Sequence, residues 1–174
     1  NDQKIITSDT GELTWNTEQP DAGFFTVNTA NTKLFTGFPA NRKIELGDVS
    51  LSVGKTRLGW ATISLVSRFA GGFGSSGKSN ILVTATGVTE NKVMTIEKVD
   101  EKHIRLSNWG TGPVVTEGIP ATLRIPADAS KTKCFALDPG GNRKMEVPVK
   151  NGGSNTSEIV LKPEYETIWY EIDI

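Results

Sequence analysis

Turn signals divide this sequence into short segments, and their spacing is the strongest constraint on its fold. Clusters of Gly, Pro, Asn, Asp and Ser recur at intervals of about 8–12 residues, the most compact being SDTG (8–11), DPGGN (138–142) and NGGSN (151–155). Many of the segments between them alternate apolar with polar residues and contain β-branched side chains, as half-buried β-strands do. We therefore predict an all-β fold of about a dozen strands, a β-sandwich of jelly-roll-like topology.

The stretch 58–87 predicts two core strands joined by a loop that is rich in Gly and Ser. In the first strand, Ala61, Ile63 and Leu65 alternate with polar residues, so these three are expected to face the core. The second strand, 81–86, is apolar and β-branched. The loop between them cannot form a core element, yet it holds two phenylalanines whose rings must fold back or meet a partner.

The segment 88–109 is the longest stretch without Gly or Pro, and it is the one serious candidate for a helix. Val93, Ile96 and Val99 would lie near one helical face. Against a helix, residues 102–106 alternate strictly, and neither a capping box nor a sustained apolar stripe appears. We interpret the segment as strands.

The composition and the length of 174 residues fit one globular domain. A mild change in composition near residues 110–113 marks a candidate boundary for a small C-terminal β unit. The net charge of −1 argues against nucleic acid as the main partner, because phosphate binding needs a clustered basic face. No apolar run approaches the length of a membrane span. Cys134, the one cysteine, excludes an intrachain disulfide and is expected to be buried.

Five segments resemble β-sandwich modules that are appended to large bacterial polysaccharide-degrading enzymes: SDTGELTW (8–15), GFFTVNT (23–29), WGTGP (109–113), FALDPGGNR (135–143) and TIWYEI (167–172). The likeness covers most of the chain, which favours one module, residues 1–174, over two. Such modules usually follow a glycoside hydrolase catalytic barrel, and some bind carbohydrate while others pack on the catalytic domain. The resemblance implies a secreted, extracellular bacterial protein. It assigns no binding role to any residue of this chain.

Four aromatic residues are the candidates for a ligand site: Trp60, Phe69, Phe73 and Trp109. Trp60 shares a strand face with Thr62 and would offer a flat apolar platform for a sugar ring. Alternatively, Trp60 lies under a neighbouring loop or packs against a partner domain. The two phenylalanines would fold over a glycan or anchor their loop, and Trp109 would line a cleft or anchor its loop.

For the remaining candidate residues, the sequence pattern favours structural roles over ligand binding. Trp15 shares a face with Leu13 and is predicted to be core, Trp169 is predicted to pack in the core or at an interface, and His103 is predicted to be solvated. One His and one Cys make a zinc site improbable, and the 71–77 glycines open no helix that could bind phosphate. A calcium site stays open, although no loop has the required spacing. We predict no cofactor and no catalytic residue.

The sequence thus predicts a non-catalytic carbohydrate-binding module that binds polysaccharide or oligosaccharide, with β-glucan, xylan or mannan as candidate ligands. The first alternative is a structural accessory domain, which would show a contiguous apolar patch that a catalytic domain of the parent chain covers. The second is a small hydrolase, which would need two carboxylates that face each other across a cleft, about 5–9.5 Å apart.

Overall fold

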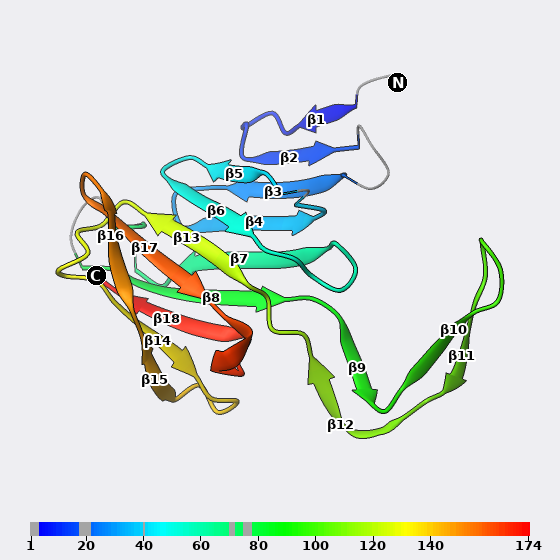
Figure 1. Cartoon of the computed structure of the whole chain (residues 1–174). Helices are drawn as coiled ribbons and strands as arrows, with labels where there is room; N and C mark the ends of the chain where they lie inside the picture. The colour runs from blue at the N-terminus through cyan, green and yellow to red at the C-terminus, as the bar shows by residue number, and fades with distance from the viewer. Residues whose placement is uncertain (1–3, 18–21, 40, 70–71, 75–77) are drawn as a thin grey trace.

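The computed structural model describes residues 4–17, 22–39, 41–69, 72–74 and 78–174. These residues form a β-sandwich with a long two-stranded projection (Figure 1). The one helical element among the described residues is a single 3₁₀ turn, Pro163–Tyr165. The predicted all-β sandwich is confirmed, and the strands alternate buried with less buried residues as the sequence pattern indicates. Residues 70–71 and 75–77 of the predicted Gly/Ser loop lie outside the described part.

The larger sheet has nine strands, all antiparallel to their neighbours. Their spatial order is β1 (Ile5–Thr7), β2 (Leu13–Asn16), β3 (Phe24–Asn28), β4 (Thr32–Gly37), β7 (Ala61–Ser67), β8 (Asn80–Thr86), β18 (Trp169–Asp173), β14 (Lys133–Leu137) and β15 (Arg143–Val147). The smaller sheet has five strands in the order β16 (Val149–Gly153), β17 (Thr156–Leu161), β13 (Ala121–Ile125), β6 (Val49–Val53) and β5 (Lys43–Leu46).

One hydrophobic core lies between the two sheets. Its side chains come from both, and the large sheet contributes Ala61, Ile63 and Leu65 of β7 as predicted. Residues before and after the candidate boundary at 110–113 belong to this same core. Cys134 is buried in it, which confirms its predicted burial. Because five strands cannot cover nine, the larger sheet continues past the smaller one at the β1 end (Figure 1).

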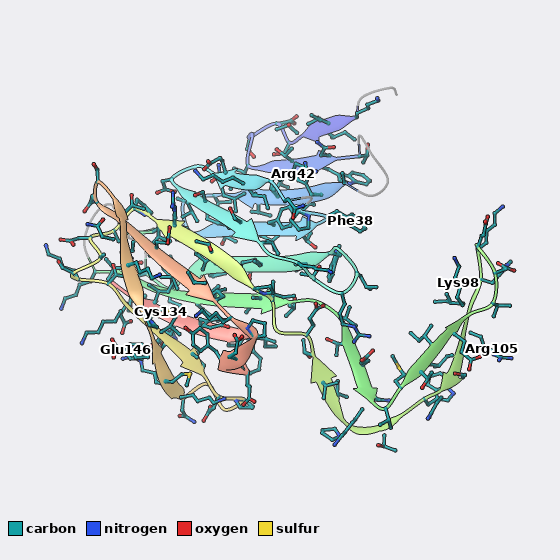
Figure 2. All side chains as sticks on the ribbon, viewed as in Figure 1. Phe38, Arg42, Lys98, Arg105, Cys134 and Glu146 are labelled. Carbon is teal, nitrogen blue, oxygen red and sulfur yellow. The ribbon has the colours of Figure 1, made fainter. Side chains whose placement is uncertain are left out.

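The projection, residues 89–116, is called the arm. Its strands are β9 (Thr89–Lys92), β10 (Thr95–Lys98), β11 (Ile104–Asn108) and β12 (Thr111–Thr116). β9 pairs with β12 near the body, and β10 pairs with β11 toward the tip. The prediction of strands over 88–109 is therefore confirmed. Figure 2 shows the arm standing away from the sandwich, with Lys98 and Arg105 on its outer part.

Candidate functional site

The four predicted ligand residues do not form one site. Trp60 immediately precedes β7 and Phe69 follows its end. At about 3.3 Å per residue, the seven residues of that strand hold the two rings more than about 20 Å apart. Trp109 lies in the arm, where its side chain is 76% exposed. Trp60 is half-buried, and Thr62 and Ser64 lie on the outward face of β7 as expected.

The two phenylalanines of the Gly/Ser loop have opposite environments. Phe73 is only 1% exposed and belongs to the core, with Lys33 Nζ 5.3 Å from its ring centroid. A buried ring offers no surface to a ligand, so this environment corresponds to the anchoring alternative. Phe69 is 59% exposed and lines a shallow hollow together with Arg68 and Lys78.

The side of the large sheet that faces away from the core, the outer face, carries an apolar cluster. Directly opposed residues on neighbouring antiparallel strands share a face, and this register places six apolar side chains together on β1 to β4. We call them the apolar half: Ile6, Leu13, Trp15, Phe25, Val27 and Leu34. No described element covers it. Trp15 is 54% exposed and Leu13 is also exposed, so their predicted place in the core is wrong.

The physical reason for this error is that alternation identifies residues that share a face without saying which face is buried. Leu13 and Trp15 do share a face, but it is the one turned away from the smaller sheet. The signal that sequence reasoning missed lies in β3, where Phe24 and Phe25 are adjacent. Adjacent aromatic residues in a strand place one ring on each side of a sheet, and Phe24 packs on the core.

A strip of hydroxyl groups borders the apolar half on the outer face. The row that contains Trp15 and Phe25 continues through Thr36, Thr62 and Thr86. Thr36 Oγ1 and Thr62 Oγ1 are 2.6 Å apart. Ser64 and Thr84 form a second hydroxyl pair with the same separation. This part of the outer face on β7 and β8 is therefore polar but uncharged, while Val66 and Leu82 add apolar side chains to the same face nearer the other end of these strands.

A network of ion pairs occupies the next part of the outer face. Glu171 of β18 accepts hydrogen bonds from Arg68 and Arg143, and Arg143 also pairs with Asp173. The Arg143 guanidinium lies 4.1 Å from the centroid of the Phe135 ring. Burial alone would raise the pKa of Glu171, but the hydrogen bonds from the two arginines outweigh it and lower that pKa. These carboxylates are held by cations, an arrangement typical of structural ion pairs.

A groove of about 600 Å³ lies where the arm meets the body, and we call it the arm groove. Trp169 contributes to it from β18, where it alternates with buried Tyr170 and so lies on the outer face. Trp169 therefore lies outside the core, and of the two positions predicted for it, packing at an interface remains the prediction. The arm is attached here by Arg57, whose Nη1 lies 2.6 Å from Glu90 Oε1 and whose backbone N–H donates to Glu117.

The groove is mainly apolar. Its wall on the arm is formed by Val114, Val115 and Thr116, and its other residues are Gly118, Pro139, Pro163, Glu166, Thr167, Ile168 and Trp169. One of these lining residues, Glu166, is charged. Its side chain is 81% exposed, and its Oε2 lies 3.5 Å from Lys144 Nζ.

Within the described part of the chain, no group of three or more His, Cys, Asp and Glu side chains is placed to hold a metal ion. His103 is exposed and its Nδ1 lies 2.7 Å from Asp100 Oδ2, which confirms its predicted solvated position. The described residues include no helix with the length and hydrophobicity of a membrane span.

The chain matches no known family model, no curated protein sequence and no solved structure.

Proposed function

We propose that this chain is a non-catalytic accessory module that packs through the outer face of its large sheet onto a folded partner domain. The apolar half carries the proposal. Its six side chains are neighbours on adjacent strands, and three of them, Ile6, Leu13 and Trp15, are exposed although they are large and apolar. A contiguous exposed apolar surface of this kind marks an interaction site.

The size of the outer face supports a protein partner. Nine strands about 4.8 Å apart make a face about 40 Å wide, and strands of three to seven residues make it about 10 to 23 Å long. The resulting area of about 700 Å² is close to what each partner contributes to a stable interface of ordinary size. The surroundings of Trp15 support the same partner class, because its near neighbours Ile6, Leu13 and Phe25 present no amide or charged side chain.

The resemblance to modules of polysaccharide-degrading enzymes supports a proposal for the partner. We take it to be a glycoside hydrolase catalytic domain encoded in the same open reading frame. The module would stabilise or orient that domain, and the fold would serve as a scaffold for the contact surface.

The test is to express this chain and the remainder of its open reading frame as two polypeptides and to measure their affinity by calorimetry. Trp15→Lys should weaken binding at least tenfold, because it places a charge where the apolar half would lose contact with water, and tryptophan is enriched among the residues that dominate interface energies. Leu58→Lys is the matched control, since Leu58 is also apolar and is exposed by 68% against 54% for Trp15, but it lies in the loop before β7. Binding that tolerates Trp15→Lys would refute the proposed face.

Glycan binding is the second candidate function, and one observation favours it. Trp15 and Phe25 lie side by side in a row that continues with the hydroxyls of Thr36, Thr62 and Thr86. Aromatic rings that stack on sugar faces, next to groups that hydrogen-bond hydroxyls, suit an extended neutral polysaccharide.

Affinity gel electrophoresis against soluble plant polysaccharides tests the glycan candidate. Retardation by one glycan that is lost in Trp15→Ala would locate a sugar site on the outer face. Retardation lost in Trp60→Ala or Trp109→Ala would return the site to the residues that the sequence indicated. An unretarded wild-type chain would leave protein docking as the function.

A further inference from the structure

We infer that the arm groove receives an extended segment of the docking partner, which adds to β12 as a third strand of the arm. This inference rests on the proposed function, because it names a second contact with the same partner. Its evidence comes from the pairing of β12, the chemistry of the groove and the continuity of the groove with the outer face.

β12 has one unpaired edge. It forms a two-stranded sheet with β9, and among the described residues no other strand pairs with it. Three consecutive residues of β12, Val114, Val115 and Thr116, line the groove, and β9 contributes none. Since successive side chains of a strand point to opposite faces, a groove that contacts all three runs along the edge of β12 rather than over one face. Backbone donors and acceptors of an unpaired edge are what an added strand binds.

The opposite wall of the groove suits apolar side chains of such a segment. Pro139, Pro163, Ile168 and Trp169 supply it, and the volume of about 600 Å³ lies within the range of ligand-binding clefts. Glu166 adds a mostly solvated carboxylate at the rim, with Lys144 at the outer limit of an ion pair. The groove therefore complements an extended segment with apolar residues and one Lys or Arg.

The groove is continuous with the outer face through Trp169. This residue lines the groove and also lies in the outer-face row that runs through Thr84, Ser64 and Leu34. A domain that covers the outer face would consequently reach the groove at its edge. The arm itself gains from the contact, because an isolated two-stranded ribbon is marginally stable in water and a third strand stabilises it.

Amide hydrogen exchange in the two-polypeptide complex tests the added strand. Over the regularly paired residues Val114, Val115 and Thr116 of β12, alternate N–H groups point toward β9 and toward the unpaired edge. We expect the edge-facing set to exchange at least tenfold more slowly in the complex than in the free chain, while the set bonded to β9 changes less. Unchanged exchange at the edge-facing amides, in a complex that forms, would overturn the inference.

A pair of arm variants provides the second readout. Val115→Lys charges the groove and should weaken the complex about tenfold. Val99→Lys charges an exposed valine near the arm tip, outside the groove, and should leave affinity within about twofold. Equal loss in both variants would place the contact along the arm rather than in the groove. Failure of the proposed function is distinguishable, because Trp15→Lys would then leave affinity unchanged.

Discussion

The thiol of Cys134 is the most protected reactive group in the chain. It lies on β14 within the core, and burial raises its pKa to about 12. Because the thiolate is the reactive form, the folded chain should resist iodoacetamide at any pH well below that value. Labelling followed by mass spectrometry should show modification that accelerates in urea in step with unfolding. Rapid labelling of the folded chain would contradict the buried position.

Gly37 at the end of β4 is tightly enclosed by its surroundings. Its φ is 138°, and a Cβ there would lie 2.4 Å from the carbonyl oxygen of Gly23. We expect Gly37→Ala to lower the free energy of unfolding by about 3 kcal/mol, through backbone strain and overlap. Gly59→Ala is the control, because Gly59 has a φ of 67° but open space around it. Backbone strain alone should lower the free energy of unfolding of this variant by about 1 kcal/mol. Urea denaturation measures both.

At the scale of elements, Glu171 joins strands that are distant in sequence. It lies on β18 and binds Arg68, which follows β7, and Arg143 of β15. The folded pKa of Glu171 lies below its ordinary value of 4.5, so its contribution to stability is present above pH 4.5 and is lost as pH falls through the folded pKa.

Glu171→Gln removes that titration, so the unfolding free energy of the variant should fall less steeply below pH 4.5 than that of the wild type. Chemical denaturation at a series of pH values provides the measurement. Glu146→Gln, which removes an exposed carboxylate from β15, is the control for the loss of one negative charge. A wild-type slope in Glu171→Gln would show that the network contributes no pH-dependent stability.

In the arm, the sequence pattern predicts that a segment is a strand but does not predict its pairing partner. Alternation over residues 102–106 identified a strand, and β11 covers 104–108. Alternation cannot say that β10 pairs with β11 and β9 with β12, nor that the resulting ribbon leaves the body, because the same pattern fits a strand inside a sheet. The position of Trp109 on this ribbon, between β11 and β12, follows from that pairing.

For the molecule as a whole, turn spacing and alternation were enough to predict the sandwich and the core side of β7. The outer face was not predictable in the same way. It depends on which strands of a nine-stranded sheet extend past a five-stranded one, and this depends on long-range pairings such as β18 between β8 and β14. Trp15 was therefore assigned to the core, since a large apolar residue is usually buried.

The long-range pairings also bear on whether residues 110–113 separate two folding units. A cut there divides both sheets, because β18 lies between β8 and β14, and β13 lies between β6 and β17. We expect fragments 1–112 and 113–174 to lack cooperative unfolding, since each would expose half of the shared core. The intact chain should unfold in a single transition. Calorimetry and the dispersion of amide resonances measure this, and a cooperative transition in either fragment would show that the chain contains two domains.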